Sequence, residues 1–162
     1  MSAAPPLSPS ARRVQEALAA LGLDCAVTEH AVPARTSQEA ALVLGCEVAR
    51  IAKSLVFRGL ATGSPVLVVA SGANRVSEAK VGALAGEAIG RAAPEFVRTV
   101  TGFAIGGIPP VGHAQPIATW VDEALLAFET VYAAGGTPNA LFAIASAELL
   151  RVCGGRSADV RA

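Results

Sequence analysis

The residue whose type and position most clearly indicate chemistry is Lys53. It lies within the apolar run of residues 51–57, so its aliphatic stem must pack against the core. Burial disfavours the ammonium form unless a carboxylate, a set of carbonyls or an anionic ligand pairs with it. Only Lys53 and Lys80 among the 13 basic residues are lysines, and each marks either a place that needs a compact ammonium group or an ordinary surface position. Lys53 is therefore a candidate contact for an anionic or polar ligand; the alternative is a lysine that extends its charge into solvent.

A second candidate is the loop of residues 106–112, where three glycines and two prolines occur in seven positions. Glycine lets a backbone come close to a ligand, and the pair Pro109-Pro110 restricts that backbone to few conformations. The loop is therefore predicted to present amide and carbonyl groups to a substrate. The alternative is a tight connection between strands that has no role in binding.

The other polar residues support fewer kinds of chemistry. His30 and His113 lie in unrelated segments without a partner at metal-ligand spacing, so no metal site is expected, although His113 follows the glycine-proline loop closely enough to reach a site there. No serine lies in a Gly-x-Ser-x-Gly motif and no cysteine has a histidine beside it, so no covalent nucleophile is indicated. Asn74, Arg75 and Lys80 form a basic cluster that either contacts a phosphate or is a solvated helix face.

Short elements of both kinds must position these residues. Capping residues and amphipathic spacing predict helices that start after Ser8, Thr36, Ser77, Ala93 and Ser146 and end near residues 21, 44, 85, 101 and 153. Runs rich in β-branched residues between turn residues predict strands at 25–31, 54–58, 65–71, 88–92, 103–105, 117–121, 129–133 and 141–145. The strands are short and do not alternate strictly with helices, which predicts an α+β fold with a bent, mixed β-sheet flanked by helices.

Length and composition favour one compact domain. The 162 residues are 52% hydrophobic and 16% charged, which suits a single domain over residues 1–162, with a core at about 10–157, a flexible N-terminus and a polar C-terminal tail. No segment resembles a signal peptide or a membrane span, so a cytoplasmic protein without a membrane partner is expected. The zero net charge argues against duplex DNA as a partner. The three scattered cysteines suggest reduced, mostly buried thiols.

The ordered set of motifs closely resembles the YbaK-like family, which is related to the editing domain of bacterial prolyl-tRNA synthetases. The resemblance runs from about residue 10 to about residue 157. Its motifs are Thr36-Ser37-Gln38-Glu39-Ala40-Ala41, Leu44-Gly45, Ile51-Ala52-Lys53-Ser54-Leu55-Val56-Phe57, Arg75-Val76 with Lys80, Ala93-Pro94-Glu95, Thr101-Gly102 and Gly106-Gly107-Ile108-Pro109-Pro110-Val111-Gly112. The resemblance implies a barrel-like version of the mixed sheet and a free-standing aminoacyl-tRNA deacylase, a hydrolase that needs no cofactor and serves translation fidelity by trans-editing.

The resemblance also implies roles for particular residues. Lys53 takes the place of the family's pocket lysine and is expected to orient the 3′ end of an aminoacyl-tRNA, with Gly106 opposite it. Substrate-binding roles are expected for the residues of the Gly-x-x-x-Pro loop and its surroundings, namely Gly107, Ile108, Pro110, His113 and Asn139. Ser77 departs from the family, since many relatives have an acidic residue there, and its contribution is open.

The sequence leaves open both which amino acid is removed and whether the protein is a catalyst. Alanine, serine, cysteine or a small non-protein amino acid on a prolyl or related tRNA all suit the resemblance, and no general base is assigned, since the ribose hydroxyl of the tRNA can take part. The alternative function is a non-catalytic module that binds tRNA or an aminoacyl-tRNA synthetase through the same pocket.

Overall fold

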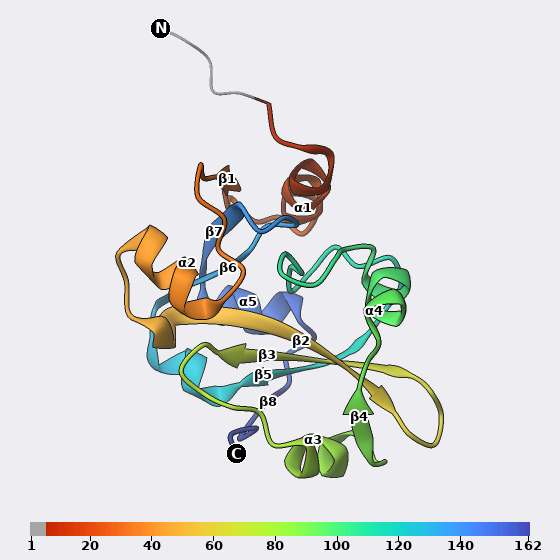
Figure 1. The fold of residues 1–162 in the computed structure, drawn as a ribbon. Helices are drawn as coiled ribbons and strands as arrows, with labels where there is room; N and C mark the ends of the chain where they lie inside the picture. The colour runs from red at the N-terminus through yellow and green to blue at the C-terminus, as the bar shows by residue number, and fades with distance from the viewer. Residues whose placement is uncertain (1–5) are drawn as a thin grey trace, which may run out of the picture.

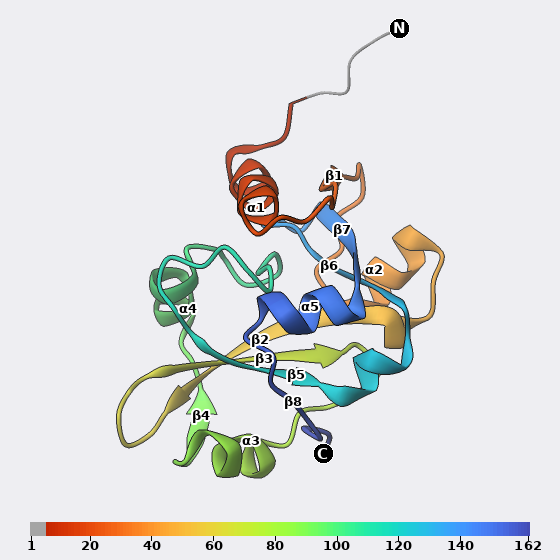
Figure 2. The same cartoon turned by 180° about the vertical axis from the view of Figure 1, so that it is seen from behind.

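The computed structural model describes residues 6–162 and has one mixed sheet flanked by helices (Figures 1 and 2). The strand order is β1-β7-β6-β2-β3-β5-β8, and β4 also pairs with β2. The predicted α+β class with a mixed sheet is therefore confirmed. The strands are β1 Thr28–Glu29, β2 Ile51–Gly59, β3 Pro65–Ser71, β4 Ile89–Arg91, β5 Ala118–Asp122, β6 Thr130–Ala134, β7 Ala140–Ala145 and β8 Ser157–Ala158; the helices are α1 Pro9–Ala20, α2 Ser37–Leu44, α3 Glu78–Ala85, α4 Pro94–Thr101 and α5 Ser146–Val152.

The centre of the sheet is the hairpin of β2 and β3. The two strands are antiparallel over seven residue pairs, from Ala52 opposite Ser71 to Arg58 opposite Pro65. Each strand then gains a parallel neighbour from a distant part of the chain, β6 beside β2 and β5 beside β3. Parallel neighbours need long connections, and here both connections include the helices α3 and α4.

One edge of β2 is only partly paired. The strand β6 pairs with Ile51 and Ala52 at the start of β2, and β4 pairs with Phe57, Arg58 and Gly59 at its end. Among residues 6–162, no strand pairs with residues 53–56 on this edge. Lys53 thus lies where the sheet opens between two neighbouring strands.

The two faces of the sheet are covered by different helices. On one face, Val14 and Leu18 of α1 and Leu149 of α5 are completely buried in the same core cluster as Leu67 and Val69 of β3; Figure 2 shows α5 lying across this side. The alternate residues of β3, Val66 and Val68, face the other side and pack with Val81 of α3. This alternation follows from the period of two in a strand, so a purely apolar strand such as β3 is buried on both faces.

Local signals place the helices close to their predicted limits. The Thr36 side chain accepts from the Glu39 N–H (3.1 Å), and Ser77 caps α3 by accepting from the Lys80 N–H (3.2 Å). The predicted reverse contact of the capping box is different, since the Glu39 carboxylate accepts from the Thr36 hydroxyl (3.1 Å). Helix α2 ends at Gly45, whose φ of +66° suits glycine best.

Ser8 is the N-cap residue of α1, as predicted, but its side chain makes no capping hydrogen bond, and the cap predicted at Ser146 is wrong. The Ser8 hydroxyl and N–H both donate to the Glu29 carboxylate, at 3.0 and 2.6 Å, and do not cap α1. Ser146 lies inside α5 as its first residue, and its hydroxyl donates to the Phe128 C=O at 2.5 Å. In both cases the hydroxyl donates to a distant acceptor and accepts from no backbone N–H at the start of the helix.

Two predicted strands also change. Residues 103–105 form no strand, because the Thr101 hydroxyl bonds both the N–H and the C=O of Phe103 and holds the chain in a turn. The strand predicted at 25–31 shortens to β1, because the Gln15 side chain bonds the Cys25 C=O and the Val27 N–H, each at 2.7 Å. Side chains of neighbouring helices satisfy the backbone here in place of a strand partner.

The C-terminal segment, predicted as a polar tail, is part of the fold. Strand β8 pairs with β5, and Val160 is completely buried. The Ser77 N–H donates to the Val160 C=O (2.8 Å), and the Ala162 N–H donates to the Arg75 C=O (2.8 Å). The flexible N-terminus that the sequence predicts lies in part at residues 1–5, outside the described residues.

Within residues 6–162, no helix combines the length and the apolar character that crossing a bilayer requires. The three cysteines are free thiols, and only Cys153 is buried.

Candidate functional site

A cavity of about 900 Å³ opens beside the unpaired edge of β2. Its walls come from β2 itself, from the segment that leads into α2, from the loop after β3, from the start of α4 and from the loop at residues 105–108. Figure 1 shows β2 crossing between α2 on one side and α4 on the other, with the loop after α4 above it. The volume lies within the range of about 300–1,000 Å³ that is typical of ligand pockets.

Lys53 lies in this cavity with its ammonium held by the backbone. The Nζ atom donates to the C=O of Asn74 at 2.6 Å. Partial burial lowers the pKa of Lys53 below that of an exposed lysine, and the nearby Asp122 carboxylate opposes this shift. Its ammonium therefore has one neutral partner and retains donors for an anionic or polar ligand.

Asp122 fixes the segment to which Lys53 is bonded. This carboxylate is buried, with 1% of its surface exposed, and it ends β5. It accepts hydrogen bonds from the Ser71 N–H (3.1 Å), the Asn74 side-chain amide (3.0 Å) and the Ala124 N–H (3.0 Å). Sequence reasoning missed Asp122, whose only local signal is a carboxylate at the end of an apolar strand.

The basic residues around the cavity outnumber the acidic ones. Arg35, Arg75, Arg91 and Lys53 line it, together with a single acidic residue, Glu78. Within the part of the chain that the structure describes, the three arginines have no hydrogen bond from the side chain, ion pair or aromatic ring beside them. By contrast, the guanidinium groups of four other arginines, at positions 13, 50, 58 and 156, stack on aromatic rings. The cavity thus has a cationic rim whose charges are available to an anion.

The basic cluster predicted at residues 74–80 is divided. Arg75 lines the cavity, and the Asn74 backbone holds Lys53. Lys80 instead donates to the Asp159 carboxylate and to the Arg161 C=O, both at 2.8 Å. Only the first part of the cluster therefore faces the candidate site.

The structure brings three of the predicted site residues together. Lys53, Gly106 and Ile108 all line the cavity. Gly106 has a φ of +102°, which is accessible to glycine and strained for other residues, so its backbone conformation explains the residue type. The predicted approach of the loop to Lys53 is thus present at Gly106 and Ile108.

The other predicted residues lie outside the cavity lining. Pro110 has its C=O near the buried Cys153 thiol (3.7 Å), whose pKa burial raises to about 12. The His113 Nε2 atom bonds the Pro109 C=O at 2.8 Å, and burial lowers the pKa of His113 while that bond opposes the shift. Asn139 donates from its side chain to the His30 C=O (2.9 Å). These groups brace the loops around the cavity, and their predicted contacts with a substrate remain predictions.

Gly107 is a packing residue between two loops. Its C=O accepts from the Gly136 N–H at 3.0 Å, and a Cβ atom at position 107 would lie 2.7 Å from the backbone of Thr137. Gly107→Ala is therefore expected to destabilise the protein by about 1–3 kcal/mol, the usual cost of overpacking. Urea denaturation measures this change. Gly90→Ala is the control, since its Cβ would meet only the flexible Leu60 side chain; equal stability of both variants would contradict the prediction.

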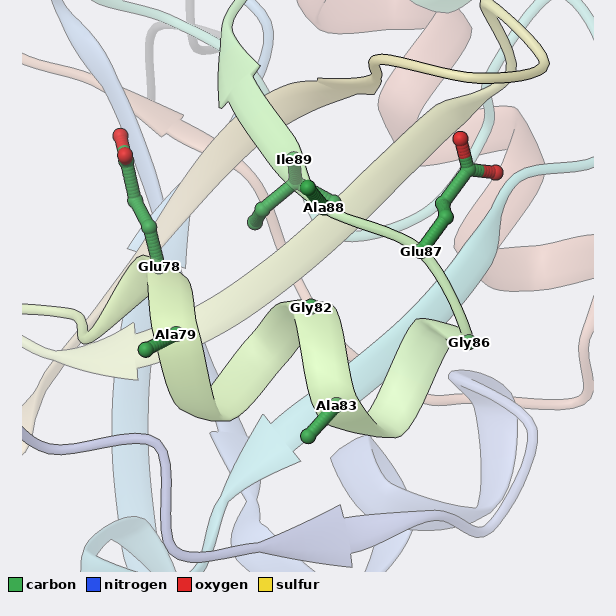
Figure 3. Close-up of a pocket in the computed structure, with 8 residues that line it drawn as sticks. All are labelled: Glu78, Ala79, Gly82, Ala83, Gly86, Glu87, Ala88 and Ile89. Atoms are coloured by element: carbon green, nitrogen blue, oxygen red, sulfur yellow. The ribbon is translucent and has the colours of Figure 1, made fainter.

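A second, smaller pocket of about 420 Å³ lies along α3 and the residues that follow it. Figure 3 shows its two carboxylates, Glu78 and Glu87, at opposite ends of the helix. Glu87 is already bonded by the Ala61 and Thr62 N–H groups and by the Thr62 hydroxyl. No basic residue lines this pocket in the described chain, in contrast to the larger cavity.

Comparisons with known proteins point to one family. Residues 31–152 match the family model of the aminoacyl-tRNA editing domain. The uncharacterized protein YwhH of Bacillus subtilis is 34% identical over 123 residues, which cover 76% of this chain and 78% of YwhH. A proline–tRNA ligase of Limosilactobacillus fermentum is 33% identical over 110 residues, which cover 65% of this chain but only 19% of the ligase.

A solved structure extends this similarity to the whole fold. It belongs to a protein proposed to be a trans-editing enzyme for prolyl-tRNA synthetase. The two folds superpose with a TM-score of 0.91 at 48% sequence identity, over 97% of this chain and 99% of that one. The fold that contains the cavity beside β2 is thus shared with this solved structure along nearly the whole length of both chains.

Proposed function

Because the chain belongs to the aminoacyl-tRNA editing domain family, we propose that it is a trans-editing deacylase that hydrolyses the ester between a small, wrongly attached amino acid and a tRNA, with tRNA-Pro as the expected carrier. The observation that carries the proposal is the cavity in which Lys53 and three unpaired arginines surround an open strand edge. The 3′ end of an aminoacyl-tRNA carries phosphates, which the basic side chains at the rim can bind. It also carries one aminoacyl ester, which the cavity can enclose.

The chemistry required is the hydrolysis of one ester. The oxygen of a water molecule attacks the acyl carbon, the bond from that carbon to the ribose oxygen breaks, and the ribose oxygen gains the proton that the water loses. The products are a free amino acid and an uncharged tRNA. Lys53 would bind and orient the aminoacylated 3′ end of the tRNA, with the loop at Gly106 opposite it. We assign no general base: one carboxylate, Glu78, lines the cavity, and the ribose hydroxyl next to the ester is expected to take part by relaying the proton from the water to the leaving ribose oxygen.

The experiment that tests the proposal is a deacylation screen. The purified protein is mixed with tRNA-Pro and other tRNAs that carry alanine, serine, cysteine or the matching amino acid, and free amino acid is measured. Rapid release from at least one mischarged tRNA, and not from the matched one, is expected. If the protein retains a mischarged tRNA without releasing its amino acid, the alternative of a non-catalytic binding module holds.

The arginines of the cationic rim are expected to determine how strongly tRNA binding depends on salt concentration. Replacing Arg35, Arg75 and Arg91 together by alanine is expected to weaken tRNA binding and to flatten its dependence on salt. Each contact with a single-stranded phosphate contributes about 0.7 to the slope of log K against log salt, so loss of three contacts lowers the slope by about 2. Filter binding at several salt concentrations measures this slope.

Arg98→Ala is the matched control for the rim. Arg98 is exposed on α4 and lies outside the cavity lining. An unchanged slope for Arg98→Ala is expected. A slope that falls equally for Arg98→Ala would mean that phosphates bind over the general surface and not at the rim.

A further inference from the structure

The open edge of β2 presents backbone groups to the cavity in a fixed order. In the hairpin, the Gly59 N–H bonds the Ser64 C=O and the Gly72 N–H bonds the Ile51 C=O. Pairs that exchange hydrogen bonds alternate along an antiparallel ladder, so residues 51, 53, 55, 57 and 59 direct their backbone groups toward β3. Residues 54 and 56 therefore direct theirs to the opposite edge, where the cavity lies.

Several polar groups on this edge lack a partner. The β6 ladder ends at Ala52 and the β4 ladder begins at Phe57. Within the described residues, no hydrogen bond reaches the N–H or C=O of Ser54 or the N–H of Val56. The Ser54 hydroxyl is also buried without a partner. An unpartnered buried polar group such as the Ser54 hydroxyl is rare in native proteins, and the unpaired backbone groups beside it line the open cavity. Together these groups favour a polar ligand that the chain itself does not supply.

If β6 continued in the same direction, its next residues would pair with these unpaired groups of β2. This strand runs parallel to β2, and its last residue, Ala134, lines the cavity. The chain then turns away, because the Gly135 N–H bonds the Ala140 C=O (2.7 Å) and leads into β7. The position opposite Leu55, which the next paired residue of β6 would occupy, is therefore part of the cavity.

An aminoacyl group has the right chemistry for this place. A residue of a parallel strand opposite Leu55 would donate its N–H to the Ser54 C=O and accept from the Val56 N–H. An aminoacyl ester carries the same donor and acceptor, its α-ammonium and its ester carbonyl, on either side of one Cα atom. A duplex end or a phosphate alone offers no such pair.

Resting on the function proposed above, we infer that the aminoacyl group of the substrate binds as one residue of a parallel strand on the open edge of β2. Its α-ammonium donates to the C=O of Ser54, and its ester carbonyl accepts from the N–H of Val56. In this direction the ester faces away from β6 and toward β4, where Arg91 lines the same cavity. The nucleotide end of the substrate thus points toward a basic side chain.

The Val56 N–H then also assists the reaction. When water attacks the acyl carbon, negative charge develops on the carbonyl oxygen that this N–H already contacts. A fixed backbone donor stabilises that oxyanion more than it stabilises the neutral ester. Loss of the donor therefore affects the rate of the chemical step as well as binding.

The test replaces one backbone N–H without changing a side chain. Incorporating the α-hydroxy acid that corresponds to valine at position 56 converts the peptide N–H into an ester oxygen. The expected result is a fall in kcat by about 100- to 1,000-fold, as for the loss of one oxyanion donor. The control is the same replacement at Val68, whose N–H belongs to the ladder with β2 and which lies outside the cavity lining; it is expected to lower stability and to leave kcat nearly unchanged.

A second measurement reads binding without catalysis. An analogue in which an amide joins alanine to 3′-amino-3′-deoxyadenosine is not hydrolysed, and its titration is followed by the amide NMR signals of the protein. The largest shifts are expected at Ser54 and Val56, and an N-acetylated analogue, which lacks the ammonium, is expected to bind at least 10-fold more weakly.

The outcomes separate this inference from the proposed function. Full activity of the Val56 variant, or analogue binding without shifts at Ser54 and Val56, would overturn the inference and leave the deacylase intact. If the wild-type protein releases no amino acid from any mischarged tRNA, the proposed function fails, and failure of the analogue to bind would then overturn the inference as well.

Discussion

Lys53→Ala is expected to lower kcat/KM for deacylation by about 100- to 1,000-fold, which corresponds to losing one charged contact with the substrate in a partly buried site. The ammonium lies in the cavity with one backbone acceptor, the Asn74 C=O, so its remaining donors are free for the tRNA 3′ end. Single-turnover hydrolysis of a mischarged tRNA measures the effect. Wild-type activity of Lys53→Ala would exclude a role for this residue.

The chain supplies a matched control for this prediction, since Lys80 is its only other lysine. Lys80 is exposed and pairs with Asp159 outside the cavity. Lys80→Ala is therefore expected to retain the activity of the wild type. Equal losses in the two variants would point to a general effect of positive charge.

The pH profile adds a readout specific to Lys53. Because burial lowers its pKa, the ammonium loses its proton at a pH below the 10.5 of an exposed lysine. The protonated form is the one that binds an anion, so affinity is expected to fall as pH rises through that lowered pKa. Lys53→Arg, which keeps its charge at all these pH values, is expected to remove this alkaline fall.

The second large effect is expected at Asp122. Asp122→Ala leaves two backbone N–H groups and the Asn74 amide without their acceptor in a buried place. Each orphaned donor costs about 1–3 kcal/mol, so a loss of about 3 kcal/mol or more in the free energy of unfolding is expected. Urea denaturation measures it, and a midpoint equal to that of the wild type would contradict it.

Asp122 is also expected to act on the site through Asn74. Asn74→Ala removes the side-chain bond to Asp122 and keeps the backbone C=O that holds Lys53. If Asp122 positions Lys53 through this residue, Asn74→Ala and Asp122→Asn each lower kcat in the folded protein, and the double variant loses less than the sum of both. Additive losses would mean that the two residues act independently.

The parts of the fold that depend on neighbouring residues were predictable from the sequence. Thr36 and Ser77 cap helices through bonds three residues away, and β2 and β3 form a hairpin across a short turn. The parallel pairs of β2 with β6 and β3 with β5 join residues more than 50 positions apart, and no local pattern specifies them. The edge opening in β2 results from these distant pairs, so it is invisible in the sequence.

The candidate site also contains residues with a local sequence signal and residues whose contacts come from distant parts of the chain. Lys53 was predictable because a charge inside an apolar run is itself a signal, and Gly106 because its loop is rich in glycine and proline. Asp122 was missed because its partners at Ser71 and Asn74 lie 51 and 48 residues away. Asn139 carried a plausible signal as a turn residue, but its amide serves the neighbouring His30 backbone.

The end of the chain offers a practical handle on the site. Ala162 is bonded to the backbone of Arg75, whose side chain lines the cavity, and the C-terminus lies far from α1 (Figure 1). A fluorescent dye attached there would lie close to the backbone of a residue that lines the cavity, and its emission is expected to change when substrate binds.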